Sequence, residues 1–297
     1  MLPDQIPLPD GSWLGYQTIG NGPQHLIMLH GFAANQGTWF DLTPFFSKEH
    51  HTLHLLDLPP HGIASRRSDA DYSIAAQATR VRALFDILNL QGVDLIGHSL
   101  GGAVALAALI QEHTTNSNKI KRLILIGTPA FPMPLPRFIH LLSLPLFGPL
   151  CLALARPETI ARKGLEAVFV NHQLITADRI ARYATTFSRS GTAHALANCS
   201  RQLIPKNHQE LTSQFQQLTT PTQLIWGDRD RIVWPDQGHR LEQAMPNATL
   251  TTIAHCGHNP HEEYPKITFD IIEHFLNNNP IDRQVRVLIK PAATCPY

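Results

Sequence analysis

Short apolar runs alternate with helical patterns along the first half of the chain. Continuous apolar runs at 24–30, 51–57, 93–96 and 121–127 are typical of strands covered on both faces. Behind Ser73, apolar residues recur at steps of three and four, which predicts a capped amphipathic helix. Strands that alternate with helices imply right-handed crossovers, so we expect an α/β fold with a doubly wound, mostly parallel sheet.

The alternation stops after residue 129. Residues 131–217 have a helical pattern whose first part is interrupted by several prolines, which predicts a helical cap inserted after the sixth strand. Strands resume at 222–226 and 248–253, with a helix expected between them at 236–244. The sheet is therefore expected to be built from two separated parts of the chain.

The ends of the domain carry weaker patterns. Residues 11–20 alternate polar and apolar side chains, and Asn21-Gly22 behind them predicts the turn of an edge hairpin. An amphipathic helix over 262–276 is expected to close the fold. We divide the chain into a core (1–130 and 218–276), a cap (131–217) and a C-terminal extension (277–297). In that extension 284–290 alternates weakly like a strand, and we assign it no function.

Composition narrows the class of partner. Of the 297 residues 43% are hydrophobic, which is enough for a large core. The 24 Lys and Arg balance 23 Asp and Glu to a net charge of +1, so we expect no nucleic-acid partner. The four Cys lie far apart, and among the 17 His the run His50-His51-x-x-His54 lacks ligand spacing, so we expect no metal. We also expect no cofactor. Residues 1–5 lack the pattern of a secretory signal, so a cytoplasmic location is expected.

A glycine-flanked serine, in Gly97-His98-Ser99-Leu100-Gly101-Gly102, lies between a predicted strand and an Ala-rich helical stretch. On such a turn a base can reach the hydroxyl, and the helix N-terminus favours negative charge. A serine that only caps the helix would show the same local pattern. Other parts of the chain must therefore decide between the two interpretations.

The later strand ends supply partners for this serine. In an open parallel sheet, reactive groups gather at the carboxyl ends of the strands. Asp228 and Asp230 follow the strand at 222–226, and His255 and His258 follow the next one. Serine, then acid, then histidine is the chain order of the hydrolase version of the catalytic triad.

On these segments the chain, from about residue 11 to 276, resembles serine hydrolases of the α/β-hydrolase fold family, esterase- or lipase-like with a helical cap. The resemblance implies that Ser99 is the nucleophile, that His258 is its base and that Asp230 orients the histidine. It favours Asp230 over Asp228 because the family places the acid three residues after the glycine in G-x-x-D-x-I-V.

The family pattern also separates the three histidines near the last strand. A Gly-His pair before a helix-opening proline selects His258 over His255 and His261. We expect His255 to lie in a loop and His261 on a helix surface.

The resemblance further implies that the backbone N–H groups of Phe32 and Leu100 form the oxyanion hole. The Phe32 side chain either lines the pocket or packs in the core. His30 and His98 flank the site and are expected to be structural. Asp57 also ends a strand, but the following Asp57-Leu58-Pro59-Pro60-His61-Gly62 departs from the family's D-x-x-G-x-G-x-S at Pro60, so we expect a loop-shaping acid with altered backbone.

Several activities of this family remain open. Ser99 argues against haloalkane dehalogenases and epoxide hydrolases, which attack with a carboxylate. Carbon–carbon bond hydrolases use serine, but typically carry a Ser-Gly-Pro-Gly type loop where this chain has Phe32-Ala33-Ala34-Asn35. Cofactor-free haloperoxidases or perhydrolases share the triad. A non-catalytic ligand-binding protein on the same fold is the alternative from another class.

The first part of the cap carries the substrate hint. Residues 131–155 are rich in Leu and Phe, which favours an acyl chain as ligand, or serves only to pack the cap on the sheet. Pro145, Gly148 and Pro149 interrupt the run, so we expect no membrane span, and weak interfacial contact stays open. We therefore expect a hydrolase of a small hydrophobic carboxylic ester, acting through an acyl-enzyme. Acyl-chain length and oligomeric state are not determined at this level.

Overall fold

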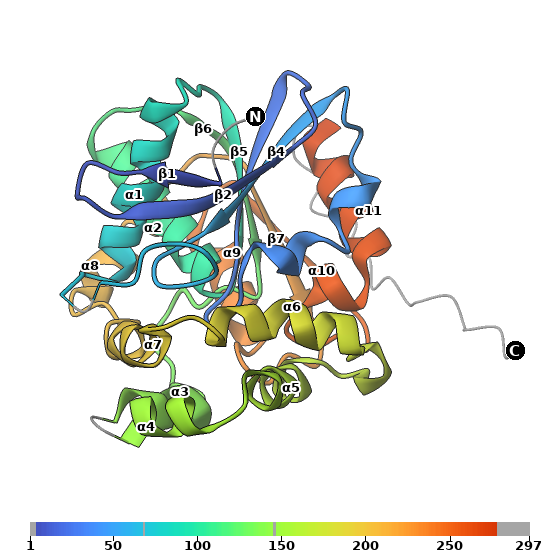
Figure 1. The fold of residues 1–297 in the computed structure, drawn as a ribbon. Coiled ribbons are helices and arrows are strands. Elements are labelled where there is room, and N and C mark those ends of the chain that lie inside the picture. Colours follow the sequence, from blue (N-terminus) through green and yellow to red (C-terminus); the bar gives the residue numbers. More distant parts are fainter. Residues whose placement is uncertain (1–3, 68, 145–146, 278–297) are drawn as a thin grey trace, which may run out of the picture.

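The computed structural model describes residues 4–67, 69–144 and 147–277, and Figure 1 shows its layers. An eight-stranded sheet has the order β1-β2-β4-β3-β5-β6-β7-β8. Its strands are β1 (Gln5–Pro7), β2 (Trp13–Ile19), β3 (Gln24–Leu29), β4 (His51–Asp57), β5 (Val93–His98), β6 (Ile120–Ile126), β7 (Thr222–Gly227) and β8 (Ala248–Ile253). Strand β2 is antiparallel to β1 and β4, and the other neighbouring pairs are parallel. The expected mostly parallel sheet is confirmed.

Helices cover both faces of the sheet. They are α1 (Ile74–Ile87), α2 (Leu100–Thr114), α3 (Arg137–Ser143), α4 (Phe147–Leu154), α5 (Pro157–Val168), α6 (Ala177–Phe187), α7 (Thr192–Arg201), α8 (His208–Ser213), α9 (Asp236–Ala244), α10 (Pro260–Glu263) and α11 (Pro265–Asn277). Four single turns of 3₁₀-helix are η1 (Gln36–Trp39), η2 (Thr43–Phe45), η3 (His172–Leu174) and η4 (Phe215–Gln217). One apolar core joins the sheet to α1, α2 and α9, and the other joins it to α11 and the η1–η2 segment. Ser73 Oγ accepts the Ala76 N–H at 3.3 Å, so the predicted helix cap is confirmed.

The chain reverses its direction of winding between β3 and β5. From β3 it moves to β4 on one side, and it then returns past β3 to β5, β6, β7 and β8 on the other. The carboxyl ends of these six strands share one edge of the sheet, and ligands bind at such a switch point. The loops after β3 and β5 therefore meet where a site is expected.

Helices α3 to α8 lie between β6 and β7 in the chain and cover this edge of the sheet (Figure 1). Helices α5 and α6 pack on each other through their own small apolar cluster, and α3 and α4 both pack on α7. Within the described ranges, no single helix is long and apolar enough to cross a membrane. Helices α3 and α4 reach that length and apolar composition only when they are taken together, and they are bent by 107° relative to each other.

One expectation about the edges of the domain is wrong, and a second is confirmed except for the start of its helix. Asn21-Gly22 does not join paired strands, because β4 pairs with both β2 and β3 and separates them. The edge hairpin is formed by β1 and β2, through a turn at 8–12. The closing helix is split into α10 and α11, because Tyr264 precedes Pro265 and a residue before proline is disfavoured in helical conformation. The extension from 278 onward, with the weak strand pattern, lies outside the described residues.

Candidate active site

Ser99 lies on a strained turn between β5 and α2. Its φ of 51° and ψ of −117° are conformations that residues other than glycine rarely adopt. A Cβ atom on Gly97 would lie 2.4 Å from the Gly101 oxygen, and one on Gly101 would lie 2.3 Å from the Leu29 oxygen. Both glycines are therefore needed for the close backbone contacts of the turn. The Ser99 side chain makes no capping bond to α2, so the helix-cap interpretation is wrong.

Asp230 and His258 form a buried pair at the ends of β7 and β8. His258 Nδ1 and Asp230 Oδ2 are 2.7 Å apart, and the two residues are 4% and 3% exposed. Asp230 Oδ1 accepts the backbone N–H groups of Ile232 at 2.8 Å and Val233 at 2.9 Å, which fixes the carboxylate. Since Nδ1 donates to Asp230, Nε2 of the neutral ring is left as the acceptor. Ser99 and His258 line the same pocket.

The predicted oxyanion donors lie on either side of the switch point. Leu100 is the first residue of α2, so its N–H has no partner within the helix. Phe32 lies in the loop after β3, and no described residue accepts a hydrogen bond from its N–H. A Cβ atom on Gly31 would lie only 3.2 Å from Ser99 Cβ, so this loop passes directly beside the serine. The Phe32 side chain lines the pockets, although it also contacts the core.

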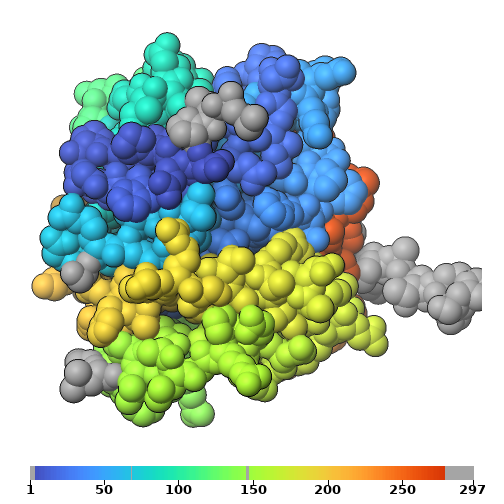
Figure 2. All heavy atoms as spheres, viewed as in Figure 1, coloured from blue at the N-terminus to red at the C-terminus, as the bar shows by residue number. Residues whose placement is uncertain are grey.

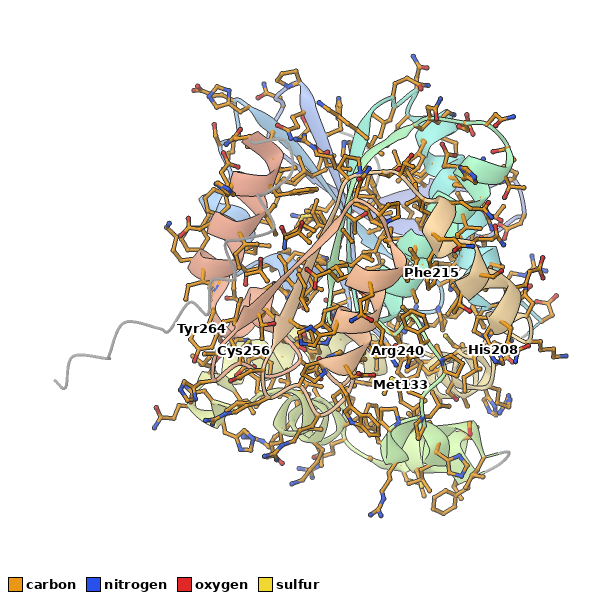
Figure 3. The ribbon with its side chains drawn as sticks, turned by 180° about the vertical axis from the view of Figure 1, so that it is seen from behind. Met133, His208, Phe215, Arg240, Cys256 and Tyr264 are labelled. Carbon is orange, nitrogen blue, oxygen red and sulfur yellow. The ribbon has the colours of Figure 1, made fainter. Side chains whose placement is uncertain are left out.

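Two apolar pockets meet at Ser99. The larger has an empty volume of about 1100 Å³, partly open to solvent, and runs along α2 from Leu100 to Ile110. Figure 3 shows Met133, His208 and Phe215, which line it from the loop after β6, from α8 and from η4. The smaller, of about 610 Å³, lies beside His258 and the cap helices α5 and α6. Among the described residues that line either pocket there is no Asp, Glu, Lys or Arg.

Comparison with known proteins identifies the family. A family model described as the alpha/beta hydrolase fold matches residues 24–265. The chain belongs to this family. A pimeloyl-[acyl-carrier protein] methyl ester esterase of Nitrosomonas europaea is 30% identical over 259 residues, 84% of this chain and 94% of that protein.

Other relatives in the family differ in activity. A 2-hydroxy-6-oxononadienedioate/2-hydroxy-6-oxononatrienedioate hydrolase of Pseudomonas putida is 27% identical over 285 residues, 88% of this chain and 92% of that protein. The solved structure of a thermophilic esterase from Thermogutta terrifontis superimposes with a TM-score of 0.75, covering 93% of this chain and 98% of that one, at 19% identity. This structural likeness shows the fold alone.

The rival residues near the last two strands do not line the pockets beside Ser99. Asp228 accepts the Cys256 N–H at 3.3 Å, as expected of a loop acid. His255 is exposed in its loop. His261 is wholly buried, so the expectation that it lies on a helix surface is wrong. Helix α10 is a single turn enclosed by neighbouring segments, so it has no free face.

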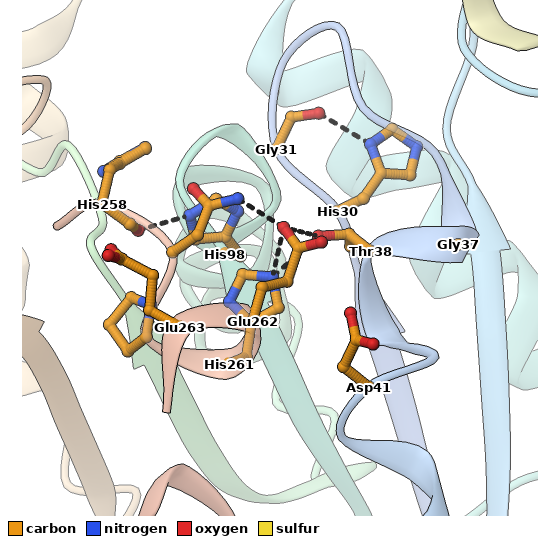
Figure 4. A network of polar contacts seen from close by, with 12 residues as sticks. His30, Gly31, Gly37, Thr38, Asp41, His98, His258, His261, Glu262 and Glu263 are labelled. Carbon is orange, nitrogen blue, oxygen red and sulfur yellow. Dashed lines mark hydrogen bonds and ion pairs between the residues drawn. The ribbon is translucent and has the colours of Figure 1, made fainter. Parts of the chain in front are cut away.

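Two buried histidines, His98 and His261, lie beside the candidate catalytic residues (Figure 4). His98 Nε2 donates to the His258 carbonyl oxygen at 2.9 Å, and its ring lies between the rings of His258 and His261. Burial, with His261 and His258 close by, holds the pKa of His98 well below its ordinary value. Burial, with His258 as the next cause, lowers the pKa of His261 to about 3. Both rings are therefore neutral at physiological pH.

His30 and Asp57 hold the neighbouring loops. His30 Nε2 accepts the Leu58 N–H at 3.0 Å while Nδ1 donates to the Gly31 oxygen at 2.8 Å, so it joins the loops after β3 and β4. Asp57 accepts the Gln36 N–H at 2.6 Å and the Ile63 N–H at 2.8 Å, and the Pro59–Pro60 bond is cis. The expected loop-shaping role of Asp57 agrees with these contacts, and the backbone altered relative to the family stays a prediction.

A buried polar network that the sequence did not reveal ties the cap to the core. Glu262 accepts the Tyr183 hydroxyl and the Asn259 amide, each at 2.5 Å, and lies 3.4 Å from Arg179 Nε. Arg179 also pairs with Asp41 at 2.9 Å. Burial raises the pKa of Glu262. These residues come from three distant segments, so no local pattern indicates their contact.

Proposed function

We propose that the protein is a serine hydrolase that cleaves a hydrophobic carboxylic ester through an acyl-enzyme. The observation that carries the proposal is the buried Asp230–His258 pair, whose histidine lines one pocket together with Ser99 on its strained turn. Membership of the alpha/beta hydrolase fold family supports it.

In this mechanism Ser99 Oγ attacks the ester carbonyl carbon while His258 Nε2 takes its proton. Asp230 holds the tautomer of His258 and stabilises the imidazolium. The N–H groups of Phe32 and Leu100 stabilise the negative charge on the carbonyl oxygen. His258 then returns the proton to the leaving alcohol, and a water molecule that it activates hydrolyses the acyl-enzyme.

The two pockets suggest how the ester is oriented. The leaving oxygen must lie beside the proton donor, so the alcohol belongs in the smaller pocket next to His258. The acyl group stays bonded to Ser99 and extends into the larger pocket along α2. From Ser99 to Ile110 this helix rises about 16 Å, which suits a medium-length alkyl chain. We infer an ester with a medium-length apolar acyl part and a smaller alcohol.

Carbon–carbon bond hydrolysis is the second candidate. It is suggested by the relative from Pseudomonas putida, whose name gives a dioate as the compound that it hydrolyses. A dioate carries two carboxylates at neutral pH, and burying them calls for cationic partners. None of the described residues that line either pocket is Lys or Arg. An ester, as in the name of the relative from Nitrosomonas europaea, is the better match.

A fluorophosphonate probe tests the proposal, because it reacts only with an activated serine. The expected result is one adduct on Ser99, absent in Ser99→Ala, whose thermal unfolding is unchanged. The native protein should hydrolyse p-nitrophenyl esters and leave a vinylogous diketone intact. Absence of the adduct in folded protein, or equal turnover by Ser99→Ala, contradicts the mechanism, and preference for the diketone favours the second candidate.

A further inference from the structure

Helices α3 and α4 expose a group of large apolar side chains at the outer end of the cap. The exposed fractions are 39% for Phe138, 46% for Leu141, 38% for Leu144, 48% for Phe147, 56% for Leu150 and 77% for Leu154. We call these six residues the α3–α4 patch. With roughly 200 Å² for each side chain, the exposed area is on the order of 600 Å². A patch of this size on a monomer usually marks an interaction site.

The patch lies at the edge of the molecule, away from the sheet. Figure 1 places α3 and α4 beneath α7, and Figure 2 shows the same green segment uncovered at the lower edge. The expectation that 131–155 either lines the substrate pocket or packs the cap on the sheet therefore covers only part of this stretch. Residues 129–136 and Ile139 line the larger pocket, whereas most of α3 and α4 faces outward.

The cap, which carries the α3–α4 patch, has an excess of positively charged residues. Residues 131–157 contain Arg137 and Arg156 but no Asp or Glu. The whole cap, 131–217, has nine Lys and Arg against four Asp and Glu, whereas the rest of the chain has 15 against 19. Arg179 and Arg182 of this count pair with the core residues Asp41 and Glu262. The other seven Lys and Arg still exceed the four Asp and Glu of the cap.

We propose that the α3–α4 patch docks on the surface of an anionic phospholipid bilayer. Apolar side chains flanked by cationic ones on short helices are suited to the boundary between headgroups and acyl chains. The helices have 7 and 8 residues, far fewer than the roughly 20 needed to span a bilayer, so they lie on it. A second copy fits less well, because about 600 Å² is below the roughly 800 Å² per partner of a stable dimer, and two basic caps repel.

The patch adjoins the pocket entrances. Phe138, within the patch, lines the smaller pocket, and its neighbour Ile139 lines both. Ile204 is 51% exposed and lines the larger pocket. A docked molecule therefore turns its apolar pocket walls toward the lipid, where a hydrophobic ester partitions. This last step rests on the proposed function, but the docking itself does not.

Sedimentation with vesicles tests the docking without any turnover. The full chain is mixed with vesicles of phosphatidylcholine alone and of phosphatidylcholine with phosphatidylglycerol. We expect binding to the mixed vesicles and weaker binding at high salt. Leu154→Glu should lower the affinity at least about tenfold, because a buried leucine contributes 1.5–3 kcal/mol. Arg137→Gln with Arg156→Gln should lower it roughly thirtyfold, at about 1 kcal/mol per charge.

Ile87→Glu is the matched control, since Ile87 is 46% exposed on α1, outside the cap, and the substitution adds the same charge. It should bind vesicles like the native chain. Hydrolysis of a short ester in solution and thermal unfolding should be unchanged in Leu154→Glu, which separates failed docking from a failed fold or a failed proposed function. Three outcomes overturn the proposal. The native chain binds neither kind of vesicle, Leu154→Glu and Ile87→Glu lose the same amount of vesicle affinity, or the native chain is a dimer that Leu154→Glu converts to a monomer.

Discussion

His98 donates a hydrogen bond from Nε2 to the carbonyl oxygen of His258, 2.9 Å away. The residue before the candidate nucleophile thus holds the backbone of the candidate base, 160 positions later in the chain. His98 Nδ1 has no partner among the described residues, which agrees with a single neutral tautomer. We interpret His98 as a positioning residue for His258.

Replacing this donor should lower kcat. In His98→Phe the ring volume is nearly kept, but the His258 carbonyl loses its partner, at a cost of about 1–3 kcal/mol. We expect kcat to fall about tenfold to a hundredfold with KM little changed, as measured on a short p-nitrophenyl ester. His98→Gln, which keeps an N–H donor, should recover part of the loss. An unchanged kcat in His98→Phe would show that the contact is only structural.

The two candidate acids should differ sharply. Asp230→Asn leaves the shape intact but favours the wrong tautomer of His258, so kcat should fall by about 10⁴-fold. Asp228→Asn should change kcat by no more than about threefold, since Asp228 only accepts one loop amide. Steady-state kinetics of both variants decide between the two residues. A larger loss in Asp228→Asn would reverse the assignment.

The two pockets should be separable by substitution. Ala107 lines only the larger pocket, so Ala107→Phe should reduce kcat/KM for long acyl chains about tenfold to a hundredfold and spare acetyl esters. Gly164 lines only the smaller pocket, and a Cβ atom there would meet nothing within 4 Å. Gly164→Leu should instead discriminate against bulky alcohols. If each variant affects acyl and alcohol size alike, the proposed orientation of the ester is wrong.

Stability should fall as the solution becomes acidic. Burial, with the nearby His25, lowers the pKa of His54 from 6.5 to about 4. Below pH 6.5 the unfolded chain binds a proton at His54 that the folded chain does not, so the free energy of unfolding decreases as pH falls toward 4. The loss from this group is about 1.4 kcal/mol per pH unit, and it is absent above 6.5.

His54→Gln should therefore show a shallower pH dependence of urea unfolding between about pH 6 and pH 5. His261 acts in the same direction, whereas the raised pKa values of Glu262 and Glu263 act in the opposite one. The contributions of His261, Glu262 and Glu263 are common to the native chain and to His54→Gln. The difference between the two chains in the pH dependence of the unfolding free energy therefore isolates His54. Identical slopes would contradict the depressed pKa.

The sequence alone determined the layered architecture, because the signals for it are local. Runs of apolar residues predict buried parallel strands, and α9 and β8 begin and end at the predicted residues 236–244 and 248–253. The strand-end rule and the family resemblance indicated Ser99, Asp230 and His258, and the structure brings the acid and the histidine together. Their catalytic roles remain predictions until the variants are measured.

Only the tertiary structure decided how distant segments meet. Strand β4 lies between β2 and β3 and pairs with both. The turn signal at Asn21-Gly22 does not reveal this insertion. His261 is buried and Arg179 joins Asp41 to Glu262 because the cap and the loops enclose them. The apolar stretch at 131–155 divides into pocket wall and exposed patch for the same reason. Periodicity gives a helix an apolar face, but only packing determines what covers that face.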